Sequence, residues 1–158
     1  MTFRLLPLLL SLSLLIIGLT GCGGAEAEPD GAAISSITIT PVGNQMEFEQ
    51  TEFTVTAGSE ITLTFNNTAT SPAMEHNVLF LTDNEEATIN RVGQAAMGAA
   101  SNAYVPGDDA VLAATDLAKP GETVTLTFTA PSEPGEYAYI CTFPGHYAMM
   151  QGTMRVTE

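Results

Sequence analysis

The sequence predicts an all-β fold, a Greek-key β-sandwich that carries one helical flap. Short segments rich in β-branched and aromatic residues, with mostly alternating polar and apolar positions, recur along most of the chain. Turn signals such as Ala57-Gly58, Pro120-Gly121 and Pro134-Gly135 separate these segments. One stretch alone has a helical period instead. Many short strands at such a spacing are typical of a sandwich or a barrel.

The strand pattern begins at Ile34 and continues to the end of the sequence. Nine segments are expected to be strands: 34–40, 45–49, 52–56, 60–67, 77–81, 110–115, 122–130, 136–141 and 152–157. Within the segment 136–141, the side chains of Tyr137, Tyr139 and Cys141 should point to the same face of the sheet, because they alternate. We expect the Tyr137 hydroxyl to bond the backbone at a corner of the sandwich, as tyrosines do in other Greek-key sandwiches.

The segment 83–101 is the one that predicts a helix. Asp83 or Asn84 can cap its N-terminus, and Gly98 can end it. The apolar side chains that would fall on one face of this helix are Ile89, Val92 and Ala96. A single helix between strand segments indicates a long crossover, which is the expected flap.

The N-terminus has the features of a secretory signal. Arg4 precedes the apolar run 5–19, which is short for a membrane span, and Leu19-Thr20-Gly21-Cys22 resembles the bacterial lipobox. We therefore expect residues 1–21 to be a lipoprotein signal peptide and residues 22–33 to be a lipidated Cys22 followed by a flexible tether. The protein would then be extracytoplasmic and lipid-anchored to a bacterial membrane. The alternatives are an ordinary signal peptide that is cut further on and an uncleaved anchor helix.

The remaining residues, 34–158, are enough for one domain with a real core. The full chain has 18 acidic and four basic residues and a formal net charge of −14, which excludes nucleic acid as an expected partner. Such a charge favours cationic partners through electrostatic steering, although solubility or a salty habitat would explain it equally well. With Cys22 lipidated, Cys141 is the one remaining cysteine, so no disulfide is expected within the chain.

Two histidines, one cysteine and a nearby methionine carry the chemistry. His146 lies five residues after Cys141, Met150 lies nine residues after it, and His76 arrives from elsewhere in the chain. Two imidazoles and a thiolate in one plane, with a weak axial methionine, are the donors of an electron-transfer copper. Pro144-Gly145 supplies the turn between the cysteine and the second histidine. Zinc also binds such donors, so the donor set alone leaves zinc open.

The segment Cys141-Thr142-Phe143-Pro144-Gly145-His146, with Met150 four residues later, resembles the ligand loop of the azurin and auracyanin group of blue copper proteins. This group belongs to the cupredoxin family. The pair His76-Asn77 resembles the family's first ligand position, and the resemblance covers about residues 35–158. It implies the cupredoxin fold and one copper ion that cycles between Cu(II) and Cu(I).

The resemblance also implies a role for each residue. His76, Cys141 and His146 would be the equatorial copper ligands, Met150 the weak axial ligand, and the backbone carbonyl of Glu75 a possible further weak contact. By the same resemblance, Asn77 would tie its loop to Thr142. The residues themselves suggest two further roles. Because Pro144 has no N–H, the amide of Phe143 is the natural donor to the cysteine sulfur. An apolar rim around His146 is expected from Met74, Pro144, Ala148 and Met149, with simple core packing as the alternative. Met149 competes with Met150 for the axial position.

The function implied is a membrane-tethered one-electron carrier. Its partners would be redox proteins, such as a cytochrome, a quinol-oxidising complex, a reaction centre or an oxidase. The alternative is an extracytoplasmic copper-delivery or copper-storage protein, although such proteins more often cluster donors on an open surface. We expect no enzyme and no small-molecule substrate, because both His76 and His146 are consumed by one metal and nothing remains for a catalytic centre.

Overall fold

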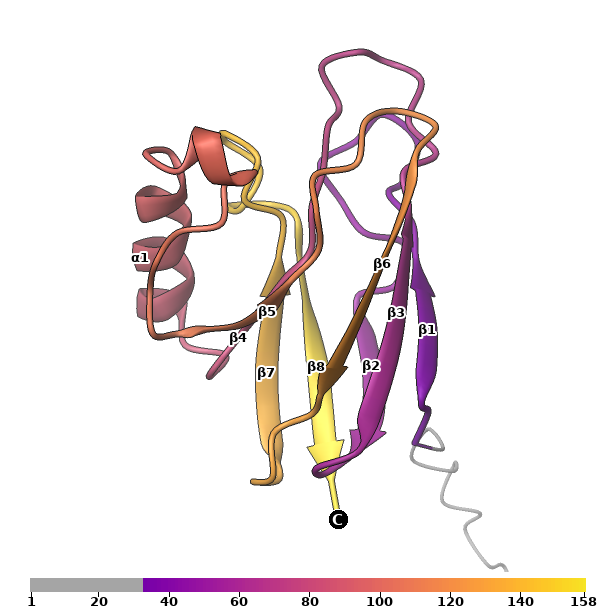
Figure 1. The fold of residues 1–158 in the computed structure, drawn as a ribbon, viewed down its shortest axis with the longest axis vertical. Coiled ribbons are helices and arrows are strands. Elements are labelled where there is room, and N and C mark those ends of the chain that lie inside the picture. Colours follow the sequence, from indigo (N-terminus) through magenta and orange to yellow (C-terminus); the bar gives the residue numbers. More distant parts are fainter. Residues whose placement is uncertain (1–32) are drawn as a thin grey trace, which may run out of the picture.

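The computed structural model describes residues 33–158, which form two β-sheets packed face to face (Figure 1). The first sheet has the strand order β1-β3-β6 and the second has the order β2-β8-β7-β4-β5. The strands of the first sheet are β1 (Ser36–Ile39), β3 (Glu60–Asn66) and β6 (Thr123–Thr129). Those of the second are β2 (Glu52–Thr56), β4 (Leu79–Leu81), β5 (Val111–Ala114), β7 (Gly135–Ile140) and β8 (Gln151–Thr157).

Pairing between strands distant in the sequence produces the Greek-key arrangement that the sequence predicts. β1 pairs with β3, and β2 pairs with β8, in parallel, whereas the remaining neighbours are antiparallel. The chain therefore passes repeatedly from one sheet to the other. The predicted all-β sandwich with one helical insertion is confirmed.

The main core lies between the two sheets and follows from strict alternation. In β3, Ile61, Leu63 and Phe65 are buried while the residues between them are partly exposed. The Tyr139 ring stands 5.4 Å from the Phe48 ring and 5.5 Å from the Phe53 ring, measured between centroids. Burial of such rings stabilises the core strongly, because each aromatic side chain removes a large apolar area from water.

The helix α1 (Glu86–Ala96) covers the outer face of the second sheet (Figure 1). Its buried residues Ile89 and Val92 belong to a second apolar cluster with Ala138 and Ile140 of β7. The predicted cap is only partly right: Glu85 occupies the N-cap position without a side-chain cap bond. The carboxylate of Asp83 instead accepts hydrogen bonds from the Glu85 N–H (2.9 Å) and the Thr88 hydroxyl (3.0 Å). A short 3₁₀ turn, η1 (Ala100–Asn102), follows.

Several strand boundaries differ from the prediction, and one predicted strand is wrong. Residues 45–49 do not form a strand, and only Phe48 makes an isolated bridge, to Pro41. The Val42 N–H donates to the Glu47 carbonyl at 2.9 Å and the Gln45 N–H donates to the Val42 carbonyl at 3.0 Å, so the chain turns between Pro41 and Phe48 and no extended ladder forms. The strand predicted at 77–81 begins at Leu79. By contrast, the Tyr137 hydroxyl donates to the Glu133 carbonyl at 2.7 Å, which confirms the predicted corner.

The predicted signal peptide, Cys22 and nearly all of the predicted tether lie outside the described residues. Among residues 33–158, no helix combines the length and the apolar character needed to cross a membrane.

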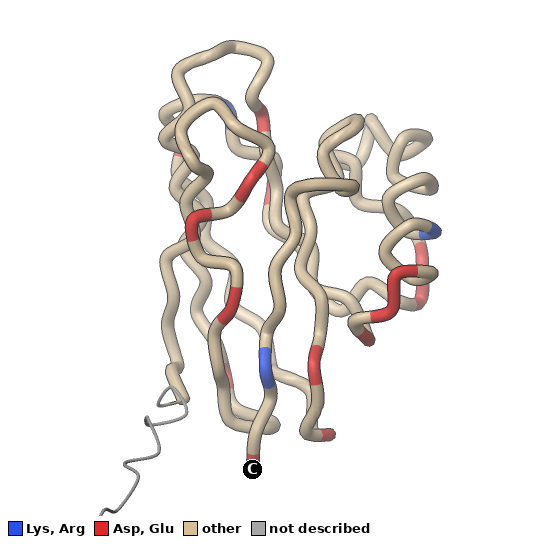
Figure 2. Tube along the Cα trace, turned by 180° about the vertical axis from the view of Figure 1, so that it is seen from behind, with Lys and Arg blue, Asp and Glu red and all other residues tan. Residues whose placement is uncertain are grey.

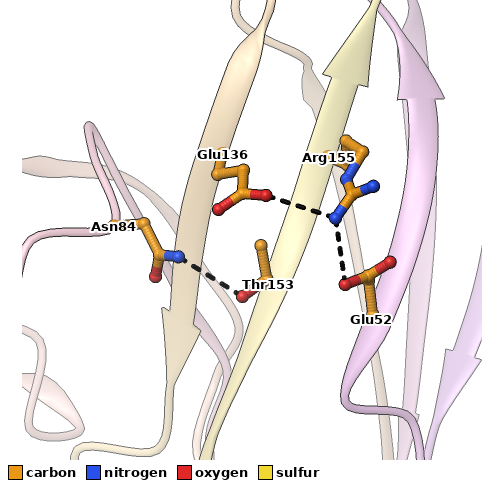
Figure 3. A network of polar contacts seen from close by, with 5 residues as sticks. All are labelled: Glu52, Asn84, Glu136, Thr153 and Arg155. Carbon is orange, nitrogen blue, oxygen red and sulfur yellow. Dashed lines mark hydrogen bonds and ion pairs between the residues drawn. The ribbon is translucent and has the colours of Figure 1, made fainter.

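A small polar network on the outer face of the second sheet links β2, β7 and β8 (Figure 3). The Arg155 guanidinium lies 3.3 Å from the Glu52 carboxylate and 3.2 Å from the Glu136 carboxylate. The Asn84 amide contacts the Thr153 hydroxyl at 3.5 Å. All these groups are at least partly exposed, so each ion pair contributes only about 0–1 kcal/mol.

Candidate metal centre

The predicted ligands converge at one end of the sandwich, where β7 ends and β8 begins. β7 ends at Ile140, so the loop 141–150 carries Cys141, His146 and Met150 across to β8. The other histidine, His76, lies just before β4 and reaches the same place because it forms an isolated backbone bridge with Ala118. The C-terminus lies at the opposite end of the molecule (Figure 1).

Three side-chain atoms form a compact triangle at this end. The Cys141 Sγ lies 3.6 Å from the His76 Nδ1 and 3.7 Å from the His146 Nδ1, and the two Nδ1 atoms are 3.1 Å apart. A point about 2 Å from all three atoms exists at the centre of such a triangle, which is the bond length of a nitrogen ligand to a divalent metal. The three residues fit a single metal ion.

The three side chains are almost completely shielded from water. His76 and Cys141 are fully buried, and His146 is 4% exposed. Burial, together with the neighbouring His146, lowers the pKa of His76 to about 4, and burial also lowers the pKa of His146. Both imidazoles are therefore neutral, and the Nδ1 atom of each faces the Cys141 sulfur in a site shielded from water. A soft, borderline cation such as copper satisfies all three donors at once.

The thiol of Cys141 is held protonated in the metal-free protein. Burial raises its pKa to about 12, and the backbone N–H groups of Asn77 and Phe143 donate to the sulfur and partly oppose that rise. These amides confirm the predicted contact from Phe143 and add a second one from Asn77. Because only the thiolate binds a metal, metal binding at neutral pH must release this proton.

Of the two neighbouring methionines, only Met150 faces the interior. Met150 is fully buried in the same apolar cluster as Cys141, and its carbonyl accepts the Cys141 N–H at 3.0 Å. Met149 is 69% exposed. This burial favours Met150 over Met149 as the axial donor. The carbonyl of the half-buried Glu75 as a further contact stays a prediction.

Hydrogen bonds join the two ligand-bearing segments directly behind the triangle. The Asn77 Oδ1 accepts the Thr142 N–H at 2.8 Å, and the Asn77 Nδ2 donates to the Thr142 hydroxyl at 3.0 Å. The predicted tie between these two residues is confirmed. Since each is adjacent in sequence to an expected ligand, the tie fixes the separation of His76 and Cys141 before any metal binds.

The segment before β5 also supports this tie, and sequence reasoning missed it. Ala103 and Tyr104 have positive φ values of 52° and 61°, an uncommon conformation for residues other than glycine. The Ala103 carbonyl accepts from the Asn77 Nδ2 at 2.9 Å, and the Tyr104 carbonyl accepts from the Thr142 hydroxyl at 2.7 Å. The strained pair thus completes the hydrogen bonding of two buried polar side chains.

Asn67 is a second supporting residue that the sequence did not single out. Its fully buried amide donates to the Met74 carbonyl (2.8 Å) and the Ala118 carbonyl (2.9 Å). Ala118 is the bridge partner of His76, so Asn67 holds both sides of the first histidine's segment. The only signal in the sequence is a pair of asparagines after a strand, which reads as an ordinary turn.

The His76 ring is held by backbone pairing and packing. Within the described chain its Nε2 is buried without a hydrogen-bond partner. The Phe65 ring meets the imidazole edge to face, with centroids 6.3 Å apart. His146 packs against the Phe143 ring at 5.0 Å. At Gly145 the φ of +85° closes the turn between these residues in a conformation that glycine adopts without strain.

Comparison with known proteins agrees with this geometry. A family model described as copper binding proteins, plastocyanin/azurin family, matches residues 36–157. Auracyanin-A of Chloroflexus aurantiacus is 37% identical to the chain over 163 residues, which cover 98% of each protein. Azurin iso-2 of Methylomonas sp. is 31% identical over 126 residues and covers 77% of this chain.

Solved structures show the same relation. The dithionite-reduced auracyanin of Roseiflexus castenholzii superimposes with a TM-score of 0.73 at 38% identity, and the match covers 80% of this chain and 99% of that one. The buried His–Cys–His group could bind one copper ion, as expected of a one-electron carrier in a cupredoxin fold. The chain belongs to the plastocyanin/azurin family of copper binding proteins.

Proposed function

We propose that this protein is a membrane-tethered one-electron carrier in which His76, Cys141 and His146 bind copper in one plane and Met150 is the weak axial ligand. The observation that carries the proposal is the buried triangle of two nitrogens and one sulfur, with sides of 3.1, 3.6 and 3.7 Å. Copper would supply the interconversion of Cu(II) and Cu(I). The sulfur donors favour the reduced ion, and the imidazoles accept the oxidised one.

The protein's contribution is to hold the same donors in both oxidation states. Backbone pairing fixes His76, the Asn77–Thr142 hydrogen bonds fix the start of the ligand loop, and strand β8 fixes the end of the loop after Met150. The interior is closed to water, since every proposed ligand is at least nine-tenths buried. Little rearrangement of protein or solvent would then accompany electron transfer.

The point of electron entry and exit is expected at His146. It is the most exposed of the four proposed ligands, and Pro144, Ala148 and Met149 are exposed in the same loop. Met74, the remaining member of the expected apolar rim, is half-buried. An apolar surface of this kind permits the close and short-lived contacts that are typical of electron-transfer partners. A cytochrome, a quinol-oxidising complex, a reaction centre or an oxidase would be such a partner.

The enclosed donor set favours a carrier over copper delivery or storage. A protein that hands over its metal needs donors that a recipient can reach, whereas His76 and Cys141 are completely buried. No titratable pair at the site suits acid or base catalysis, so we do not expect an enzyme.

The test of the copper site is a visible absorption spectrum of residues 23–158 with one equivalent of Cu(II), beside the Cys141→Ser variant. We expect an intense blue band that bleaches reversibly with a reductant and is missing from the variant. A protein that binds Cu(I) tightly but never develops the band would instead support copper delivery.

The tether has its own test. The full chain, expressed in a bacterium with lipoprotein processing, should partition into the detergent phase of a membrane extract. The Cys22→Ala variant, made with a signal peptide that an ordinary signal peptidase removes, should appear in the aqueous phase with its copper band intact. Equal partitioning of both forms would remove the lipid anchor from the proposal without affecting the copper site.

A further inference from the structure

Tyr147 lies directly on the backbone of Gly93 in helix α1. A Cβ atom placed on Gly93 would stand 2.2 Å from the Cγ of Tyr147 and 2.3 Å from its Cδ2, so no side chain fits there. Gly93 has no positive φ, and its conformation does not require glycine. Glycine is unfavourable in the middle of a helix. Its presence here is explained by the ring that occupies the space of the missing side chain; we call this space the Gly93 socket.

The two residues at the centre of the ligand loop pack in different directions. His146 faces the copper triangle, against His76 and Phe143. The next residue, Tyr147, packs against the second apolar cluster, which lies beneath α1 and includes Leu79, Leu81, Ile89 and Val92. The loop therefore joins the copper site to the helical flap through two consecutive side chains.

Hydrogen bonds within the loop hold its central residues together in one turn. The His146 N–H donates to the Phe143 carbonyl at 2.9 Å, and the His146 carbonyl accepts the N–H groups of Met149 (3.0 Å) and Met150 (2.8 Å). These bonds fix the shape of the turn, while the Asn77–Thr142 hydrogen bonds and β8 hold the two ends of the loop. The Tyr147 ring in the Gly93 socket supplies a lateral contact that reaches outside the loop.

We propose that Tyr147, seated in the Gly93 socket, is a positioning residue for His146, so that the helical flap sets the geometry of the copper site without contributing a ligand. This inference rests on the proposed role of His146 as a ligand. The inference gives helix α1 a role at the copper site, although the helix contributes no ligand.

The experiment begins with Gly93→Ala, which adds one methyl group where the ring now lies. Outer contacts of metal ligands are typically worth 10–100-fold in metal affinity, so we expect copper affinity to fall about tenfold or more and the blue band to shift. Gly98→Ala is the matched control, because its new Cβ would meet only the Ala95 carbonyl oxygen at 3.6 Å, an ordinary contact. Tyr147→Phe keeps the ring and should retain the spectrum of the unaltered protein.

A double-mutant cycle separates positioning from a general loss of stability. When Tyr147→Ala has emptied the socket, adding Gly93→Ala should cause no further loss of copper affinity, because the methyl group then has room. Nuclear Overhauser contacts between the Tyr147 ring and the Gly93 Hα in the metal-free protein should be present and should vanish in Gly93→Ala. Metal-free stability of each variant is measured by urea denaturation.

Two results would overturn the inference. One is an unchanged band and copper affinity in Gly93→Ala, whether or not urea stability falls, since the contact would then be structural only. The other is an equal effect of Gly98→Ala. Neither result resembles a failure of the proposed function, in which the unaltered protein itself would develop no blue band.

Discussion

At the scale of the residue, the site combines groups that the fold keeps uncharged until a metal arrives. Burial holds the Cys141 thiol protonated, with its pKa raised to about 12, and keeps His76 neutral. A dry pocket cannot stabilise a lone thiolate, so the metal and the proton compete for the same sulfur. Copper uptake should therefore be steeper with pH than the imidazoles alone would require.

The two adjacent methionines give a clear test of the axial ligand. Met150→Gln should retain the blue site but lower the reduction potential, because an amide oxygen is a harder donor that favours Cu(II). We expect a decrease of at least about 60 mV, which is a tenfold change in relative affinity for the two oxidation states. Met149→Gln, at the 69% exposed position, is the control. Cyclic voltammetry that gave the larger shift for Met149→Gln would reassign the ligand.

The pKa of His76 predicts how the metal-free protein responds to acid. The pKa is about 4 in the folded protein and about 6.5 in the unfolded chain. The unfolded chain thus binds more protons between these values, and the stability due to the neutral ring is complete above about pH 6.5 and is lost as the pH falls to about 4. We expect a loss of about 3 kcal/mol in the free energy of unfolding across this window.

Urea denaturation of the metal-free protein at a series of pH values measures this loss. His76→Asn, which does not titrate in the window, should show a flatter profile than the unaltered protein. Parallel profiles for the two proteins would mean that other groups control the acid response.

At the scale of the element, the ligands are held by residues that none of the ligand segments contains. Asn67 at the end of β3 bonds the carbonyls of Met74 and Ala118, and the Ala103–Tyr104 pair bonds Asn77 and Thr142. Both contacts join segments far apart in the sequence. The sandwich strands bring the donors to one end, and these polar contacts then fix their separation.

Asn67→Ala tests that support. Removal of the amide takes the donor from the Met74 carbonyl, the acceptor from the Ala69 N–H and one of two donors from the Ala118 carbonyl, which should cost on the order of 2–3 kcal/mol in the free energy of unfolding. Asn66→Ala is the matched control, because the half-buried Asn66 only accepts a bond from the exposed Thr123 hydroxyl at 3.2 Å and should change stability by less than about 0.5 kcal/mol. Urea midpoints that moved equally for both variants would contradict the assigned role.

The difference between what the sequence predicts and what it misses has a physical cause at this scale. The motif from Cys141 to Met150 is contiguous and ends a strand, so its donor chemistry and its turn can be read locally. The role of Asn67 depends on a bond to Ala118, 51 residues away, which no local pattern contains. The false strand at 45–49 fails for a similar reason: its alternation is local, but Gln45 and Glu47 bond Val42 in a turn in place of a ladder.

At the scale of the whole molecule, the acidic residues are spread widely but none lies in the ligand loop 141–150. The ligand loop is apolar and nearly uncharged, whereas 18 acidic residues against four basic ones give the full chain a formal net charge of −14. Figure 2 shows acidic positions spread over the sandwich and at the start of helix α1, with few basic positions among them. Such a field acts over a Debye length and attracts cationic reagents before any contact forms.

This field should be visible in reactions with small redox reagents of opposite charge. Oxidation of the reduced protein by a cationic cobalt complex should slow about tenfold or more as salt rises from about 0.01 M to 0.5 M, because screening shortens the range of attraction from roughly 30 Å to a few ångströms. The reaction with anionic ferricyanide should accelerate over the same range. Stopped-flow traces of the copper band measure both rates. If both reagents instead responded weakly and alike, the apolar loop alone would govern approach to the copper, and the acidic surface would serve solubility.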